Sequence, residues 1–490
     1  MSTVALSQGA GSVAIDAAAV LEPDLCVIGA GSAGLSLTAA ARALDLSVVL
    51  VERHRMGGDC LNTGCVPSKA LIAAARHAHA IRTAAAFGVT AGAPEVDAAA
   101  VRAHVRSVID GIAPHDSVAR FERLGATVIS AEARFTGPDT LVAGGRTVKA
   151  KRFVVATGSR PQLPPVPGLD QVPVLTNESV FDLDALPRRL VVIGGGPIGL
   201  ELAQAFRRLG AAVTVLTRGE ILSRDDREAV AVVRARLLAE GVDIVEHAVV
   251  DRVATVPDGA TVTVTVGGAT RQVAASHILV AAGRAPVTDG LGLEDAGVET
   301  TPKGITVTPA LRTTNWRIYA IGDVAGSFQF THWASHQAGQ VLRTILTRLP
   351  QKEATGSVIW ATYTDPEIAH VGLSEAEARR RHRTVRVLRA PYLENDRART
   401  DRDTEGFVKI ITGAGGRILG AELVGPGAGE TASLFALALA GRLKVSHLAG
   451  MIAPYPTLAE VAKRAAVTSY ADTAKHPFVR RVIRLLRATL

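Results

Sequence analysis

A pattern of strand, glycine turn and helix that occurs twice constrains this fold more than any other feature. In the first copy, the apolar run 25–28 leads into Gly-Ala-Gly-Ser-Ala-Gly at residues 29–34, and an Ala-rich helical stretch follows. A second apolar run, 47–51, ends in Glu52. Glycines let the backbone approach a pyrophosphate, the helix N-terminus faces its charge, and the terminal acid binds ribose hydroxyls. This copy predicts a dinucleotide site that includes Gly29, Gly31, Ser32, Ala33, Gly34, Glu52 and Arg53.

The second copy has a strand at 191–193, a glycine turn at 194–199, a helix at 200–208 and a further strand at 212–216. That strand is followed by Thr217, where an acid would bind a free 2′-hydroxyl, and then by Arg218 and Arg224. Because arginines attract the 2′-phosphate that an acid would repel, the pattern favours NADPH. Arginines that are ordinary surface charge, with NADH as the donor, are the alternative. The predicted residues of this site are Gly194, Gly196, Pro197, Ile198, Gly199, Arg218 and Arg224.

Two dinucleotide folds, one ending in an acid and the other in arginine, indicate two different dinucleotides. We expect a tightly held FAD at the first and a diffusing NADPH at the second. A third strand-to-turn unit, 318–323, ends in Asp323, whose carboxylate suits a polyol hydroxyl. Further cofactor-binding residues are predicted at strand ends and beside the cysteines: Gly58, Asp59, Ala156, Thr157, Gly158, Gly283, Arg284, Gly322 and Asp323.

Cys60 and Cys65 lie five positions apart in a turn-rich segment that runs into a helical stretch, predicted from Lys69 to about residue 86. A disulfide requires Cα atoms within roughly 4.4–6.8 Å, so the chain between the cysteines must be irregular, as Thr63 and Gly64 permit. Sulfurs at a helix N-terminus have a lowered thiol pKa. The segment therefore predicts a redox-active pair. Buried or metal-binding cysteines are the alternative, but no Cys or His lies nearby at zinc spacing, and we predict no metal site.

Chain length, apolar runs, cysteine count and net charge limit the class of protein. The 490 residues allow two to four domains, and no apolar run approaches the roughly 20 residues that span a bilayer. The first 22 residues do not have the pattern of a signal peptide, and three cysteines are too few for a disulfide framework, so we expect a cytoplasmic protein. The net charge of +8 comes from scattered arginines and suits anionic ligands, but no nucleic-acid-binding module is present.

Over about residues 23–470, these motifs resemble the class I pyridine nucleotide–disulfide oxidoreductases, which include dihydrolipoamide dehydrogenase, glutathione reductase and mercuric reductase. The resemblance is most specific in Gly-Gly-x-Cys-Leu-Asn-x-Gly-Cys-x-Pro-Ser-Lys at residues 57–69. It implies an α/β fold with two Rossmann-like dinucleotide-binding domains, the FAD domain interrupted by the NAD(P) domain, and a C-terminal α+β dimerisation domain of a homodimer. The expected boundaries are 1–160 and 285–354 for FAD, 161–284 for NAD(P), 355–476 for the interface, and 477–490 for a basic tail.

The resemblance also implies roles. Glu52 and Asp323 match residues that hold the FAD ribose and ribitol, Cys65 the thiol stacked on the flavin, and Cys60 the interchange thiol. Lys69 and Glu201 match an ion pair beside the flavin and are expected to serve both catalysis and cofactor binding. The implied reaction passes hydride from NADPH to FAD and electrons to the Cys60–Cys65 disulfide, and the resulting dithiol reduces an external acceptor.

One departure concerns the acceptor. The family's His-Pro-Thr-x-x-Glu string supplies a proton-shuttling His from the partner subunit, but here Tyr455 replaces the His while Glu460 is kept. A phenol is a poor general base at neutral pH. Mercuric reductases also carry Tyr there, yet they have a C-terminal cysteine pair, and this sequence has no cysteine after Cys65. We expect a disulfide-type acceptor. The alternatives are Hg(II), a lipoyl-type dithiol, a quinone reduced directly by flavin, and a flavin-bound redox sensor without turnover.

The segment 477–487 is basic and amphipathic. Phe478, Val482 and Leu485 share one helical face with Leu486, whereas Arg480, Arg484 and Arg487 line another. We expect a helix that docks on the dimer, with peripheral contact to an anionic membrane as the alternative.

Overall fold

The computed structural model describes residues 20–351, 358–471 and 477–488. Within these, unit 1 contains residues 20–58, 114–159 and 286–351, and unit 2 contains residues 59–113, 160–285, 358–471 and 477–488. The expected start of the FAD domain, the 354/355 boundary, the end of the interface domain at 476 and the last two residues of the tail lie outside the described residues. The five expected domain ranges stay predictions.

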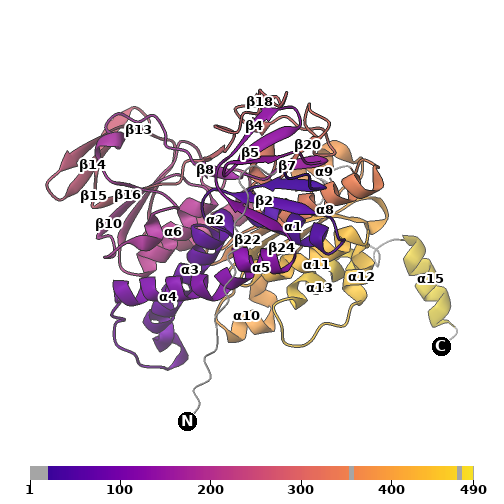
Figure 1. The fold of residues 1–490 in the computed structure, drawn as a ribbon. Helices are drawn as coiled ribbons and strands as arrows, with labels where there is room; N and C mark the ends of the chain where they lie inside the picture. Colours follow the sequence, from indigo (N-terminus) through magenta and orange to yellow (C-terminus); the bar gives the residue numbers. More distant parts are fainter. Residues whose placement is uncertain (1–19, 352–357, 472–476, 489–490) are drawn as a thin grey trace, which may run out of the picture. The chain divides into compact units, whose positions relative to one another are not determined.

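Unit 1 is built on a parallel sheet with the strand order β20-β7-β1-β2-β3 (Figure 1). Its strands are β1 (Leu25–Ile28), β2 (Val48–Glu52), β3 (Thr127–Ser130), β7 (Arg152–Val155) and β20 (Ile318–Ala320). The helices α1 (Ser32–Arg42) and α8 (Thr331–Thr347) pack against each other. The strands are almost continuously apolar because a parallel sheet is covered on both faces. The carboxyl ends of β1, β2 and β7 therefore lie at one edge, where the first predicted site begins.

The rest of unit 1 is a small antiparallel sheet of β4 (Ala133–Gly137), β5 (Thr140–Ala143) and β6 (Arg146–Val148). The hairpin β18 (Thr300–Thr301) and β19 (Gly304–Ile305) and the short helix α5 (Val118–Arg123) complete it. Phe135 and Phe153 meet edge to face, with ring centroids 5.2 Å apart, in the core that joins the two sheets.

Unit 2 contains a second parallel sheet, with the order β12-β11-β10-β16-β9. Its strands are β9 (Val174–Leu175), β10 (Arg189–Ile193), β11 (Ala212–Leu216), β12 (Asp243–Val245) and β16 (His277–Val280), and its helices are α6 (Pro197–Arg208) and α7 (Arg227–Ala239). An antiparallel sheet of β13 (Ala248–Val256), β14 (Gly259–Val266) and β15 (Ala269–Ala275) joins it; β13 and β15 were not expected. The strands β8 (Ser159–Pro161) and β17 (Arg284–Pro286) lie at the chain crossings between the units.

The helical part of unit 2 differs from the expectation at one point that concerns the site. The short helix α2 (Gly58–Asn62) is followed by α3 (Cys65–Thr83), and then by α4 (Ala98–Ile112). Helix α3 was expected to begin at Lys69, but it begins at Cys65. Pro67 is compatible with this start because the first turn of a helix needs no amide donor there. Cys65 is therefore the first helical residue.

The C-terminal part of unit 2 is an antiparallel sheet with the order β21-β22-β25-β24-β23. Its strands are β21 (Ile359–Thr362), β22 (Glu367–Gly372), β23 (Arg386–Pro391), β24 (Phe407–Thr412) and β25 (Ile418–Gly425). The helices are α9 (Glu375–Arg381), α10 (Asp396–Thr400), α11 (Ala428–Ala440), α12 (Val445–Gly450), α13 (Glu460–Val467) and α15 (Pro477–Arg487). In the parts of the chain that the structure describes, no helix has the length and apolar character needed to cross a membrane.

Candidate active site

The first glycine turn, in unit 1, has a backbone that only glycine allows. Gly29 has φ +105°, and a Cβ there would lie 2.4 Å from the carbonyl oxygen of Ala156. A Cβ on Gly34 would lie 1.9 Å from the carbonyl oxygen of Gly29. Gly58 approaches Gly31 in the same way, since its Cβ would lie 2.7 Å from the Gly31 Cα. The turn is thus bare of side chains where a pyrophosphate would meet the N-terminus of α1.

Two carboxylates accompany this turn. The Glu52 carboxylate accepts hydrogen bonds from the backbone amides of Ala30 and His54, both at 2.7 Å, which fixes it beside the glycine turn. Asp323 accepts a hydrogen bond from the Ser159 hydroxyl and opens the 3-10 turn 322–325 after β20. The glycine turn and the two fixed carboxylates fit the expected FAD; the ribose role of Glu52 and the polyol role of Asp323 stay predictions.

The other residues expected in this site lie around the same sheet edge. Ser32 and Ala33 open α1, and Ala156, Thr157 and Gly158 follow β7 directly. The Thr157 hydroxyl is already bonded to the carbonyl oxygen of Val287 at 2.7 Å. Gly322 donates its amide to Gln337 at 2.7 Å, and Arg53 is exposed, 3.9 Å from Glu132.

The second glycine turn, in unit 2, repeats the geometry of the first. Gly194 has φ +132°, a Cβ there would lie 2.2 Å from the carbonyl oxygen of Ala281, and a Cβ on Gly199 would lie 2.1 Å from that of Gly194. Gly196 is the N-cap of α6 and Pro197 its first residue, followed by the exposed Ile198. Because the same clashes recur at corresponding positions, the two turns have the same shape and leave the same space for a pyrophosphate.

Two cations stand beyond the end of β11. Arg218 and Arg224 are both exposed, and within the described ranges neither side chain takes part in a hydrogen bond or an ion pair. Thr217 packs on the glycine turn, since a Cβ on Gly195 would lie 2.9 Å from the Thr217 Cβ. The guanidinium groups can therefore turn toward an anion without first breaking a contact.

The two cysteines flank a tight bend between helices. Cys60 lies in α2 and is half-buried, whereas Cys65 opens α3 and is exposed. Gly64 caps α3, and a Cβ there would lie 2.9 Å from the carbonyl oxygen of Asp59. The third cysteine, Cys26, is fully buried in β1, and burial raises its pKa, as expected for a core residue.

A polar network holds the bend between the cysteines. The Asp59 carboxylate accepts hydrogen bonds from the Thr63 hydroxyl at 2.6 Å and the Asn177 amide at 2.9 Å, and it pairs with Arg284 at 3.1 Å. The Asn177 amide also donates to the carbonyl oxygen of Thr63 at 3.2 Å. Asn177 was not singled out from the sequence, because it lies 118 residues from Asp59 and no local pattern marks it. Asp59 and Arg284 thus hold the cysteine bend in place; Gly283 lies just before Arg284.

Lys69 and Glu201, expected to pair, lie on neighbouring helices of unit 2. The Lys69 Nζ is 2.7 Å from the Glu201 Oε2, and the other Glu201 oxygen accepts the backbone amide of Tyr363 at 2.8 Å. Nζ also lies 4.4 Å from the centre of the Tyr363 ring. Burial raises the Tyr363 pKa, and the charges of Glu367, Glu201 and Cys65 add to this. Tyr363 is a further residue of this cluster that the sequence did not reveal.

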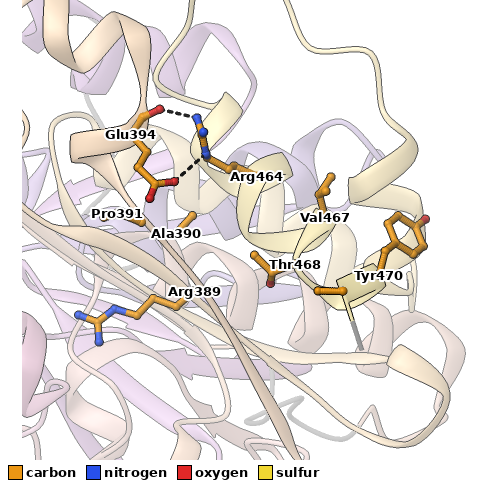
Figure 2. Close-up of a pocket in the computed structure, with 9 residues that line it drawn as sticks. Arg389, Ala390, Pro391, Glu394, Arg464, Val467, Thr468 and Tyr470 are labelled. Atoms are coloured by element: carbon orange, nitrogen blue, oxygen red, sulfur yellow. Dashed lines mark hydrogen bonds and ion pairs between the residues drawn. The ribbon is translucent and has the colours of Figure 1, made fainter. Parts of the chain in front are cut away.

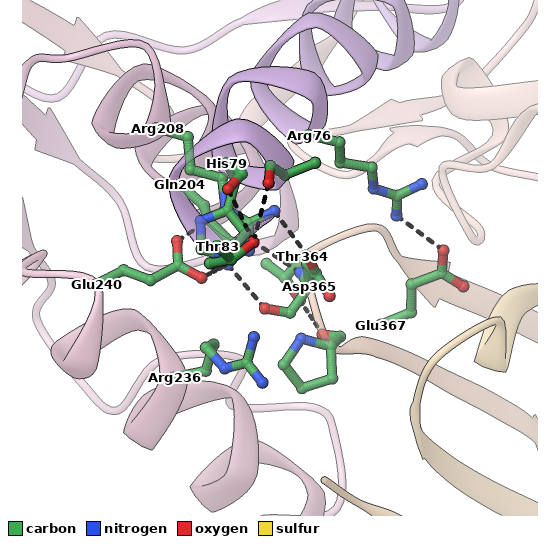
Figure 3. A network of polar contacts seen from close by, with 12 residues as sticks. Arg76, His79, Thr83, Gln204, Arg208, Arg236, Glu240, Thr364, Asp365 and Glu367 are labelled. Carbon is green, nitrogen blue, oxygen red and sulfur yellow. Dashed lines mark hydrogen bonds and ion pairs between the residues drawn. The ribbon is translucent and has the colours of Figure 1, made fainter. Parts of the chain in front are cut away.

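A buried clamp holds the helix that carries Glu201 (Figure 3). The Arg208 guanidinium pairs with Glu240 at 2.6 Å and with Asp365 at 2.7 Å. The Gln204 side chain exchanges two 2.8 Å hydrogen bonds with the backbone of Asp365. Glu201, Gln204 and Arg208 share a face of α6, so the helix is fixed to the segment 363–365 along its whole length.

Tyr455, which stands in place of the expected His, is 72% exposed. Its hydroxyl donates a hydrogen bond to Asp396 at 3.1 Å, which raises the pKa of the phenol. The Glu460 carboxylate accepts the backbone amide of Thr457 at 3.0 Å and so closes the loop that presents Tyr455. Tyr455 is therefore a protonated donor at neutral pH.

A cavity of about 610 Å³ lies elsewhere in unit 2, beside β23 and α13 (Figure 2). None of the expected site residues lines it. Its two arginines already have partners, since Arg464 pairs with Glu394 at 3.0 Å and Arg389 pairs with Glu228. Across the described residues, no group of three or more His, Cys, Asp or Glu side chains could hold a metal ion.

Comparisons with known proteins agree with this architecture. Residues 23–338 match the family described as pyridine nucleotide-disulphide oxidoreductase, and residues 358–466 match its dimerisation domain. A mercuric reductase of Streptomyces lividans is 38% identical over 464 residues, 92% of this chain and 97% of the relative. A dihydrolipoyl dehydrogenase of Geobacillus stearothermophilus is 33% identical over 461 residues, 91% and 96% of the two chains.

Among solved structures, the HOCl-induced flavoprotein disulfide reductase RclA from Escherichia coli matches with a TM-score of 0.80 and 27% identity, over 91% of this chain and 99% of that chain. The expected fold class, two Rossmann-like domains with a C-terminal dimerisation domain, is confirmed. The chain belongs to the class I pyridine nucleotide–disulphide oxidoreductases, a family of FAD-dependent oxidoreductases that work with NAD(P)H.

Proposed function

We propose that this enzyme uses NADPH to reduce a thiophilic metal ion, with Hg(II) as the first candidate, through FAD and the Cys60–Cys65 pair. Tyr455 is the observation that carries the choice of acceptor. Exchange between a dithiol and a disulfide needs a base to deprotonate the attacking thiol and an acid to protonate the leaving sulfur. A soft metal ion binds thiolates directly and leaves no sulfur to protonate. The raised pKa of Tyr455 makes it unfit as a base near neutral pH.

The residues around the two cysteines have separate roles in the proposed reaction. Cys65 opens a 19-residue helix, whose N-terminal dipole stabilises a thiolate, and Cys60 lies in α2, before the bend that Asp59 and Asn177 hold. When bound, FAD would accept a hydride and pass its two electrons on. In the overall balance, NADPH and Hg(II) give NADP⁺, a proton and Hg(0), so two electrons leave the donor and two reach the metal ion.

NADPH is proposed as the donor because of Arg218 and Arg224. Both guanidinium groups are exposed beyond the end of β11, where a 2′-phosphate would lie in a Rossmann-like site. An acid at Thr217 would have favoured NADH, and none is present.

The enzyme is proposed to act as a homodimer. Large apolar side chains stand exposed on the C-terminal part of unit 2, including Ile452 at 98% and Leu437 at 68%. A large exposed apolar patch is typical of a protein interface. Ile452→Glu should give monomers in sedimentation velocity, while Trp316→Glu, at an exposed apolar residue of unit 1, should leave dimers.

A disulfide acceptor is the second candidate, favoured by the likeness to a flavoprotein disulfide reductase. NADPH oxidation separates the two when it is measured with Hg(II), Cu(II), glutathione disulfide and lipoamide in turn. The proposal expects turnover with a metal ion at a rate well above that with either disulfide, and its loss in Cys60→Ser. Faster turnover with a disulfide would refute it.

A matched pair of variants tests the argument from Tyr455. Tyr455→His restores an imidazole and should raise turnover with a disulfide by about 10²-fold, since general base catalysis contributes roughly 10²–10⁴-fold. Tyr455→Phe should not raise it. An equal response of both variants would remove the reason for preferring a metal ion.

A further inference from the structure

The C-terminal helix α15 (Pro477–Arg487) has its apolar and its basic side chains on separate faces. At 3.6 residues per turn, its apolar side chains fall within one arc of about 160°. These are Phe478, Val479, Val482, Ile483, Leu485 and Leu486. Arg480, Arg481, Arg484 and Arg487 fall within the remaining arc, and the helix has no acidic residue. Such a division is typical of helices that lie in the plane of a membrane surface.

Both faces of α15 are open to solvent in the structure. Phe478 is 68% exposed and Leu485 is 65% exposed, and the four arginines are exposed as well. Exposed apolar side chains on one helix face indicate a surface that binds another protein or a membrane in the functional state.

The charges on α15 indicate which kind of surface covers the helix. Four arginines on a helix that has no carboxylate favour binding to an anionic surface. The nearest candidate on this chain is the cavity that begins at Tyr470 and Ala471, just before the stretch that leads to α15. The carboxylate in its wall, Glu394, is already paired with Arg464 at 3.0 Å, so the cavity does not complement the charge of the helix.

From these observations we propose that α15 is an interfacial anchor that holds the enzyme on anionic phospholipid. The apolar arc enters the boundary between headgroups and acyl chains, and the arginines remain at the level of the lipid phosphates. The helix of 11 residues is about 16 Å long, too short to span a bilayer, so it lies on the surface. A single short helix binds reversibly. This inference does not depend on the acceptor of the enzyme.

Flotation of the full-length holoenzyme with lipid vesicles tests the anchor. We expect it to float with vesicles of phosphatidylcholine mixed with an equal amount of phosphatidylglycerol, and not with phosphatidylcholine alone. Arg481→Gln combined with Arg484→Gln should lower the partition coefficient about 30-fold, since each arginine near an anionic surface contributes about 1 kcal/mol. Leu485→Glu should abolish flotation, because it places a charge within the apolar arc.

The matched control removes the same charge elsewhere. Arg380→Gln with Arg383→Gln changes two exposed arginines outside α15 and should leave flotation unchanged. NADPH oxidation by the unbound enzyme should be the same in all variants, which separates loss of the anchor from loss of the fold.

Three results would overturn the proposal. Flotation could be absent from anionic vesicles, it could persist in the α15 double variant, or it could fall equally in the control pair. A shift from dimer to monomer on deletion of 477–490, without any flotation of the intact enzyme, would instead assign α15 to the dimer.

Discussion

Lys69 and Glu201 form an ion pair between α3 and α6, with Nζ 2.7 Å from Oε2. The Glu201 side chain is almost wholly buried, whereas that of Lys69 is 37% exposed. Because Glu201 also accepts the Tyr363 amide, a single carboxylate fixes the cation and the segment that follows β21. The pair is therefore structural, and its lysine follows Cys65 by four positions in α3.

Removing the two partners of this pair should have unequal effects. Lys69→Met leaves a buried carboxylate without its cation and should cost about 2 kcal/mol, after allowance for the exposure of Lys69. Glu201→Gln keeps an acceptor for the Tyr363 amide and should cost about 1 kcal/mol. Urea unfolding measures both, and the double variant should lose less than the sum. Arg397→Met, in an exposed pair with Asp401, is the control and should change little. Additive losses would show that the pair is not coupled.

Asn177 should control the reactivity of Cys60. Asn177→Ala removes the amide that holds Asp59 and the carbonyl of Thr63, so the bend between the cysteines opens more often. We expect faster alkylation of Cys60 by iodoacetamide, measured by peptide mass spectrometry. Asn315→Ala is the control, because that amide also donates two hydrogen bonds but lies in unit 1. An unchanged rate at Cys60 in Asn177→Ala would contradict the role of the network.

Cys26 should not react in the folded protein. It is fully buried in β1 and its pKa is raised by burial, whereas Cys60 is half-buried and Cys65 exposed. Since the thiolate is the nucleophile, alkylation of the reduced native enzyme should modify Cys60 and Cys65 alone. All three should react after unfolding in urea. Native labelling of Cys26 would show that the sheet of unit 1 opens readily.

Arg218 should determine the preference for the phosphorylated donor. Arg218→Ala should reduce kcat/KM with NADPH by about 10–100-fold, since a hydrogen bond to a charged group contributes about 1.5–3 kcal/mol. Turnover with NADH should change little. Arg188→Ala, at another exposed arginine of unit 2, is the control. Equal losses with both donors would show that Arg218 does not contact a 2′-phosphate.

Asp403 should make the fold less stable above acidic pH. Burial raises its pKa from the ordinary 3.8 to about 6, and its Oδ1 has no hydrogen-bond partner among the described residues. A carboxyl group whose pKa is higher in the folded than in the unfolded protein stabilises the fold at pH values below its unfolded-state pKa. This stabilisation is lost as the pH rises through the pKa of the folded state. Asp403→Asn should therefore stabilise the enzyme by about 2 kcal/mol at pH 7.

The effect of Asp403→Asn should fade between pH 6 and pH 4, as the native Asp403 becomes protonated in the wild type. Thermal unfolding across this range measures it. Asp258→Asn, at an exposed residue elsewhere in unit 2, is the control. A stabilisation that does not vary with pH would exclude titration of Asp403 as its cause.

The sequence predicted the buried strands well because a parallel sheet has a near-continuous apolar signal. The strands at 25–28 and 212–216 were found with their observed bounds. β15 was missed because its sequence Ala-Thr-Arg-Gln-Val-Ala-Ala has a single large apolar residue and is mostly exposed. The start of α3 was placed late because Pro67 reads as a helix breaker, although it is tolerated in a first turn.

The candidate site was predictable where residues act through local patterns. Glycine turns, strand-end acids and the cysteine segment are all short-range signals. Asn177 and Tyr363 could not be found in this way, because each is fixed by contacts more than a hundred residues distant, to Asp59 and to Glu201. Such contacts depend on how helices and strands pack against one another, and this packing cannot be read from a single sequence.

We infer that electrons from NADPH reach the Cys60–Cys65 pair. Anaerobic titration of the oxidised holoenzyme with NADPH, followed by visible absorption, tests it most directly. We predict a long-wavelength band during the first equivalent, from the Cys65 thiolate against oxidised flavin, and its absence in Cys65→Ser. Bleaching of the flavin without this band in the wild type would contradict the claim and would point to electrons that leave the flavin directly.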